Sequence, residues 1–131
     1  MIDHVNALVL PVHDVEKCAS FYRDALGMEM LSKGEKDAYF RIGPKGGLIL
    51  ALISVEDVAA LVTKERIPTA TGSRNNSYYS VFVEDVDKEF EMLREKGVSF
   101  IKPPVTYPWG QRIAYFEDPE GNMWEISTRP K

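Results

Sequence analysis

The pattern of apolar and polar residues divides the chain into two stretches with the same order of predicted elements. In the first stretch, a mainly apolar run over 5–12 predicts a strand, and apolar residues at helical spacing between Asp14 and Gly27 predict a helix. Asp14 suits the N-cap because its carboxylate can accept a hydrogen bond from a free backbone N–H, and Gly27 can end the helix. Three further strands are predicted at 28–32, 38–42 and 48–53.

The second stretch repeats this order. A strand is predicted at 78–83, Asp85 is the N-cap of a second helix that ends at Gly97, and a strand follows at 98–102, before two prolines. The last two strands flank Asp118-Pro119-Glu120-Gly121. This segment is typical of a turn because proline presets φ and glycine can adopt a positive φ.

Local sequence matches indicate that the two stretches are repeats. The segment Asp14-Val15-Glu16-Lys17 resembles Asp85-Val86-Asp87-Lys88, and Ala38-Tyr39-Phe40 recurs as Ala114-Tyr115-Phe116. We therefore predict an α+β fold of two tandem βαβββ modules within one domain. Module 1 covers about 1–53, a linker about 54–76, and module 2 about 77–131. The linker begins with a short helix and continues as a loop, which is either a flap over a pocket or a solvated connection.

The last predicted strand alternates between its two faces. Trp124 and Ile126 share an apolar face, whereas Met123, Glu125 and Ser127 share the other. A carboxylate in a partly dry site needs a partner, because burying it unpaired is costly. The candidate partners of Glu125 are Arg112, Arg41, the Tyr78 hydroxyl, water and a cationic group on a ligand.

Composition and charge exclude several classes of protein. The chain has 131 residues, which favours one domain, and a formal net charge of −4 without a basic cluster, which argues against binding to nucleic acid. No apolar run approaches the roughly 20 residues of a membrane span, and no signal pattern opens the sequence. The single Cys18 excludes an internal disulfide. It fits a packing thiol in a reducing compartment, so we expect a cytoplasmic protein.

These motifs are similar to those of the vicinal oxygen chelate superfamily, which includes glyoxalase I, extradiol dioxygenases, fosfomycin-resistance enzymes and bleomycin-resistance proteins. The resemblance covers nearly the whole chain. Besides the capping and turn motifs, it rests on Ser20-Phe21-Tyr22, Leu26-Gly27-Met28 and Asn122 after the turn. It implies a curved mixed sheet around a central cleft, with helices outside, and commonly a homodimer.

The resemblance also implies where metal ligands would lie. Metal-dependent members carry them seven residues before each capping Asp and in the fourth strand of each module. These positions hold Ala7, Tyr78, Glu125 and Leu50, or Ala51 if the register shifts by one. His4 falls on the opposite strand face from Ala7 by parity. A catalytic zinc usually has three protein ligands, and tyrosine is rarely one of them, so we predict no metal and no cofactor.

A ligand-binding site is predicted around the cleft. The segment Trp109-Gly110-Gln111-Arg112 is similar to the Trp-Gly-Arg-type segment that borders the drug groove of bleomycin-resistance proteins. Trp109 offers a platform worth roughly 0.5–2 kcal/mol for a planar or cationic ligand, or it packs at a dimer seam. Glu125 is the candidate catalytic residue. The predicted ligand-binding residues are Ala7, Phe40, Leu50, Tyr78, Trp109, Arg112 and Glu125.

Three functions remain open at this point. The first is metal-independent binding or sequestration of a small aromatic or cationic molecule, and we favour it. The second is a metal-dependent lyase, isomerase or dioxygenase with atypical ligands. The third is a metal-free enzyme in which Glu125 is a general base. The expected partners are a small-molecule ligand and a second copy of the chain, with no nucleic acid and no membrane.

Overall fold

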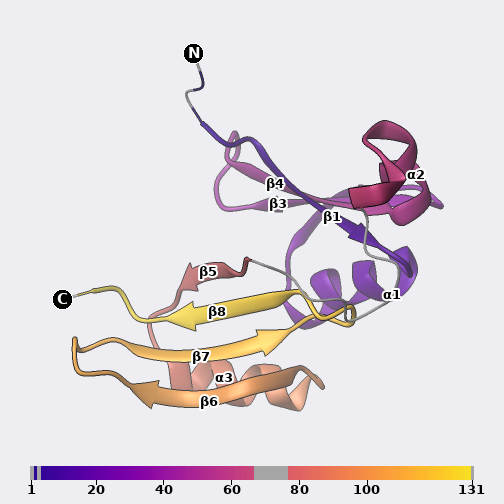
Figure 1. The fold of residues 1–131 in the computed structure, drawn as a ribbon. Helices are drawn as coiled ribbons and strands as arrows, with labels where there is room; N and C mark the ends of the chain where they lie inside the picture. The colour runs from indigo at the N-terminus through magenta and orange to yellow at the C-terminus, as the bar shows by residue number, and fades with distance from the viewer. Residues whose placement is uncertain (1, 3, 67–76, 131) are drawn as a thin grey trace. The chain divides into compact units, whose positions relative to one another are not determined.

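The chain folds into two compact units, residues Met1–Thr71 and Gly72–Lys131, each of which holds one four-stranded sheet (Figure 1). The computed structural model describes residues 2, 4–66 and 77–130. The strand order is β1-β4-β3-β2 in one sheet and β5-β8-β7-β6 in the other. In each sheet the first and last strands of the module pair in parallel, and the other pairs are antiparallel. The predicted α+β fold of two βαβββ modules is confirmed.

The first unit follows the predicted order of elements. Asp14 caps the first helix, with its carboxylate accepting from the Lys17 backbone N–H at 2.9 Å, and Gly27 ends the helix at a φ of 68°. The last part of that helix has π-helical hydrogen bonding instead of the α-helical bonding that we predict. The elements are β1 (Ala7–Val12), α1 (Val15–Ser20), the π-helical turn η1 (Phe21–Ala25), β2 (Glu29–Lys33), β3 (Asp37–Ile42) and β4 (Leu48–Ser54).

The predicted short helix after β4 is present as α2 (Val55–Leu61), followed by a 3₁₀ turn, η2 (Lys64–Arg66). Ser54 caps α2 by accepting from the Asp57 backbone N–H at 3.2 Å. This helix packs against β4 and β1 within the first unit. Most of the loop predicted after it, residues 67–76, lies outside the described residues.

The second unit repeats the arrangement of the first. Asp85 caps its helix by accepting from the Lys88 backbone N–H at 3.0 Å, and Gly97 follows the helix at a φ of 88°. The elements are β5 (Tyr79–Phe82), α3 (Val86–Glu95), β6 (Ser99–Thr106), β7 (Arg112–Glu117) and β8 (Met123–Ser127). Because both the capping geometry and the strand order recur, the predicted duplication is seen in three dimensions as well as in sequence.

The strand β6 is longer than the sequence predicts. It continues through Pro103 and Pro104 to Thr106, whereas we predict its end at Lys102. Its pairing with β7 shifts register on both sides of Lys102. The reason is that β6 lies at the edge of its sheet, where one side of the strand makes no ladder bonds, so a proline without an N–H is tolerated there.

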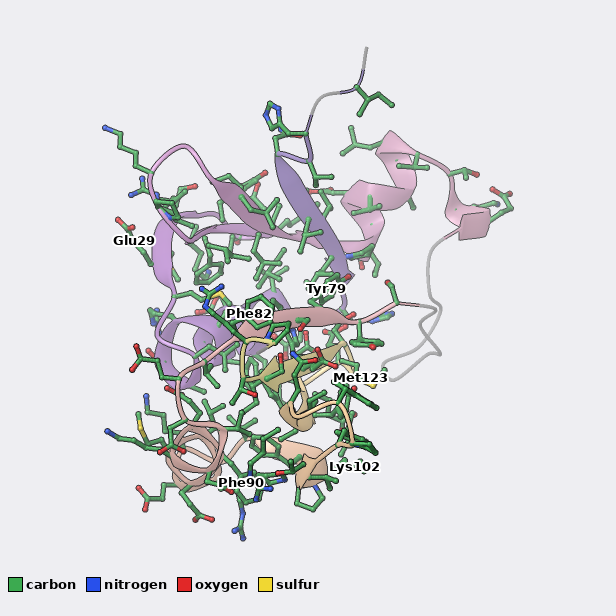
Figure 2. The ribbon with its side chains drawn as sticks, turned by 90° about the vertical axis from the view of Figure 1, so that its left-hand side faces the viewer. Glu29, Tyr79, Phe82, Phe90, Lys102 and Met123 are labelled. Atoms are coloured by element: carbon green, nitrogen blue, oxygen red, sulfur yellow. The ribbon has the colours of Figure 1, made fainter. Side chains whose placement is uncertain are left out.

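The two faces of the second sheet differ in character. On the face that packs against α3, an aromatic chain leads from Phe90 through Phe100 and Phe116 to Trp124, with ring centroids 4.6, 5.6 and 6.3 Å apart. Trp124 and Ile126 are 2% and 3% exposed, so the predicted alternation of this strand is confirmed. We call the opposite side the distal face. Figure 2 shows Lys102 and Met123 on it, away from α3.

Candidate functional site

Three neighbouring elements bring a hydrogen-bonded cluster together on the distal face. Strand register places Glu125 opposite Ser80 on one side and Tyr115 on the other. The Ser80 hydroxyl donates to Glu125 Oε1 at 2.5 Å, and the Tyr115 hydroxyl donates to Oε2 at 2.6 Å. Tyr78, directly before β5, meets the Tyr115 ring edge-on with centroids 5.6 Å apart. We call Tyr78, Ser80, Tyr115 and Glu125 the carboxylate cluster.

The electrostatics of this cluster centre on the Glu125 charge. Donation to the Glu125 carboxylate raises the pKa of Tyr115 well above its ordinary value, and partial burial and the charge of Glu125 raise it further. Tyr115 therefore stays a neutral hydrogen-bond donor at physiological pH. Among the residues that the structure describes, none forms an ion pair with Glu125. Within the described residues, the carboxylate is thus held by two neutral donors and forms no ion pair.

The cluster can be reached from solvent. Tyr78 is 49% exposed, Ser80 is exposed, and Tyr115 and Glu125 are partly buried. A carboxylate bonded to one phenol, with a second phenol ring packed against the first on an accessible sheet face, can attract a cation or accept hydrogen bonds from a ligand.

Arg112 is one of the candidate partners of Glu125, but the structure pairs it with another carboxylate; its role in ligand binding stays a prediction. Its guanidinium donates to both carboxylate oxygens of Asp87 in α3, at 2.7 and 2.8 Å, and to the Thr106 hydroxyl at 3.0 Å. Arg112 and Tyr115 are three residues apart in β7, so their side chains point to opposite faces of the sheet. Tyr115 is on the distal face, and Arg112 is therefore on the α3 side. The other arginine considered, Arg41, forms an ion pair with Glu29 at 3.2 Å.

Leu50 and Phe40 are core residues, and their assignment to the ligand lining is wrong. Both are fully buried, and the Phe40 ring packs 6.1 Å from that of Tyr22 in the first helix. No side-chain surface is left for a ligand. The register also decides the repeat mate of Glu125: Ala51 pairs with Tyr39 as Glu125 pairs with Tyr115, so the one-residue shift considered above is correct.

Ala7 begins β1 in the first unit and is partly buried, whereas the whole carboxylate cluster belongs to the second unit. The role of Ala7 as a lining residue stays a prediction.

Trp109 lies in the turn between β6 and β7, as predicted, and is 62% exposed. Its indole stacks on the Tyr107 ring, with centroids 4.9 Å apart and an angle of 16° between the planes. The indole N–H donates to Gln111 Oε1 at 3.0 Å. The Lys102 ammonium lies 5.3 Å from the Tyr107 centroid and donates to the Tyr107 hydroxyl at 2.8 Å. Trp109 thus offers an aromatic face with its N–H already used.

The described side chains do not fit a catalytic metal ion. In the described ranges, no three or more His, Cys, Asp or Glu residues gather closely enough to hold one. The four positions that the resemblance indicates hold Ala7, Ala51, Tyr78 and Glu125. Of these, only the carboxylate is a usual ligand, and both of its oxygens accept hydroxyl hydrogens. No helix in the described part of the chain is long and apolar enough to cross a membrane.

Two members of the cluster were missed by sequence reasoning. Ser80 belongs to no motif, and Tyr115 belongs only to the repeated Ala-Tyr-Phe segment; their contacts with Glu125 follow from strand register. A signal was present, however, because Tyr115 alternates with the apolar Ala114 and Phe116 in the same way as Glu125 alternates with Trp124 and Ile126.

Comparisons with known proteins give a consistent family. The family model described as "Glyoxalase/Bleomycin resistance protein/Dioxygenase superfamily" matches residues 1–126. The uncharacterized protein YraH of Bacillus subtilis is 34% identical over 118 residues, which cover 89% of this chain and 91% of YraH. The metallothiol transferase FosB of Staphylococcus saprophyticus is 25% identical over 128 residues, which cover 98% of this chain and 78% of that protein.

Solved structures agree with the family model. A glyoxalase/bleomycin resistance protein/dioxygenase from Nocardioides matches with a TM-score of 0.80 and 30% identity, covering 100% of this chain and 86% of that one. The similarity therefore extends over the whole fold and is not confined to one module.

Proposed function

Because the chain belongs to the glyoxalase/bleomycin resistance protein/dioxygenase superfamily, we propose that it binds a small aromatic or cationic molecule on the distal face without a metal ion. The observation that carries this proposal is the state of Glu125. Its carboxylate accepts hydrogen bonds from Ser80 and Tyr115 and forms no ion pair within the described residues. An accessible anion of this kind lacks the counter-charge that a bound cation would supply.

The aromatic surface of the second unit supports the same proposal. Tyr78 is about half exposed beside Glu125, and Trp109 is more exposed still. Exposed rings of this size are favourable contacts for planar molecules, and their π-faces attract cations. Metal independence is supported by the donor set, since Ala7 and Ala51 have no side-chain atom that can ligate an ion.

Two planar probes test the proposal, the cation proflavine and the neutral acridone. We expect micromolar binding of at least one probe, seen as quenching of Trp109 fluorescence, with the same dissociation constant before and after treatment with EDTA. Trp124 is buried, so Trp109→Leu should remove most of the quenching signal, and binding is then followed by probe fluorescence. Failure of both probes to bind, or loss of binding in EDTA, would contradict the proposal.

A second candidate is metal-dependent group transfer, favoured by the relatives named metallothiol transferase FosB, which are 25–28% identical over 97–98% of the chain. The residues at the expected ligand positions argue against this candidate, because Ala7 and Ala51 cannot ligate a metal ion. Elemental analysis of the purified protein separates the two candidates. About one tightly bound divalent ion per chain, with turnover that a chelator abolishes, would favour the transferase.

We also propose that the protein is cytoplasmic. The chain has a single cysteine, the buried Cys18, and so cannot form an internal disulfide, which supports a reducing cytoplasm.

A further inference from the structure

We infer that the carboxylate cluster recognises a quaternary or similarly soft organic cation in preference to a neutral molecule or a primary ammonium ion. This inference rests on the proposed function, because it assigns a ligand class to the same site. It joins three features of the distal face: a carboxylate that forms no ion pair among the described residues, two tyrosine rings in contact within the same cluster, and one hydroxyl donor on each carboxylate oxygen.

The first feature is the source of attraction. Glu125 is partly buried, so its field is screened less than that of a fully exposed carboxylate. Three basic side chains near this part of the sheet have other partners: Arg112 pairs with Asp87, Lys102 donates to the Tyr107 hydroxyl, and Arg129 lies 4.8 Å from the Phe82 ring. Of these three, only Arg112 is neutralised by a carboxylate, and none forms an ion pair with Glu125.

The second feature is the shape of the aromatic surface. The Tyr78 and Tyr115 rings meet at an interplanar angle of 79°, and the Tyr115 hydroxyl donates to the Glu125 carboxylate. Aromatic faces arranged around a cationic group are how proteins commonly bind quaternary ammonium ions, because the ring quadrupoles attract the charge and the methyl groups gain apolar contact. Tyr78 is exposed enough to contact such a group.

The third feature separates the classes of cation. A primary ammonium binds a carboxylate by donating N–H bonds, and it must lose strongly held water to do so. Here each Glu125 oxygen already accepts a hydroxyl hydrogen, from Ser80 or from Tyr115. These two bonds use about two of the roughly four lone-pair sites of the carboxylate, which leaves fewer for the N–H groups of a primary ammonium. A quaternary ammonium has no N–H to place and is weakly hydrated, so it uses the charge without needing the remaining sites. Ser80 and Tyr115 are therefore positioning residues for the Glu125 carboxylate.

The test uses three probes of nearly one shape: benzyltrimethylammonium, its neutral isostere neopentylbenzene, and benzylammonium. Dissociation constants come from ligand-observed NMR titration of the full chain. We expect the quaternary probe to bind about tenfold or more tightly than the neutral isostere, and more tightly than benzylammonium. Glu125→Gln should remove the preference for charge while leaving binding of the neutral probe unchanged, which also shows that the variant is folded.

Glu117→Gln is the matched control. Glu117 lies two residues from Tyr115 on the same strand and pairs with Met123, so it carries a carboxylate on the same face without the two hydroxyl donors. The preference should persist in this variant. Equal binding of the quaternary and neutral probes, equal or tighter binding of benzylammonium, no binding of any probe, or an equal loss in Glu117→Gln would each overturn the inference. If acridone still binds in that case, the proposed function stands; if neither planar probe binds, both fail.

Discussion

At the scale of single residues, the properties of a strand residue depend on the residue paired with it on the neighbouring strand, which a sequence motif does not show. Glu125 and its repeat mate Ala51 occupy equivalent positions opposite Tyr115 and Tyr39, yet only one of the two pairs contains a charge. In the second unit this difference converts a tyrosine on a strand into a donor with a strongly raised pKa. The duplicated fold has thus kept the tyrosine in both modules and an acid in one.

The raised pKa of Tyr115 predicts a loss of stability at high pH. The folded state holds the phenol proton more tightly than the unfolded state, where tyrosine titrates near about pH 10. The stabilisation is complete below that pH and is lost as the pH rises above it, because the unfolded chain then releases the proton first. In urea unfolding, the free energy of wild type should fall more steeply above about pH 10 than that of Tyr115→Phe.

Tyr39→Phe is the control for this measurement, because Tyr39 has the same strand position but faces Ala51. It should keep the wild-type decline with pH. The interpretation would be wrong if Tyr115→Phe and Tyr39→Phe altered the decline equally.

At the scale of elements, helix caps and turns are determined by residues close together in sequence, whereas the ends of strands depend on pairing with distant segments. Both aspartate caps, Asp14 and Asp85, accept from the backbone N–H three residues ahead, as their sequence context predicts. The end of β6 was mispredicted because the two prolines would stop an inner strand but are allowed at the edge of a sheet. The identity of the edge strand is decided by pairing over long sequence separations.

The Asp85 cap predicts a measurable contribution to stability. Asp85→Ala removes the acceptor for the Lys88 N–H at the start of α3, and it should lower the free energy of unfolding by about 1 kcal/mol. The neighbouring exposed Glu84→Ala, which leaves the cap in place, should change it by less than about 0.5 kcal/mol. Chemical denaturation measures both. A similar loss in the two variants would show that the cap is not the cause.

At the scale of the whole molecule, the two units share one topology but differ in the side chains at their equivalent strand positions. In the first unit the strand residues that the family resemblance singles out are alanines or fully buried apolar side chains. The second unit carries the carboxylate cluster and the Trp109 platform. The two repeats thus differ in side-chain chemistry on one topology, which agrees with the general rule that a fold alone does not specify an activity.

The family resemblance predicts a homodimer. We expect sedimentation equilibrium at micromolar concentration to give about twice the chain mass of 14.8 kDa. The variant Trp109→Leu distinguishes the two roles considered for this exposed residue, a ligand platform and a dimer contact. It should weaken planar-probe binding without changing the mass if Trp109 is a ligand platform, and it should shift the mass toward the monomer if Trp109 packs at a dimer seam. A monomeric wild-type protein would contradict the prediction.

The sequence by itself determined the order of elements, the duplication, both helix caps and the face on which Glu125 lies. These follow from alternation, helical spacing and turn chemistry, which depend on residues close together in the chain. Only the tertiary structure decided that Arg112 pairs with Asp87, that Leu50 and Phe40 are core, and that Ser80 and Tyr115 hold Glu125. The physical reason is register, because a shift of one residue moves a side chain to the opposite face of the sheet, and register is set by pairing between strands far apart in sequence.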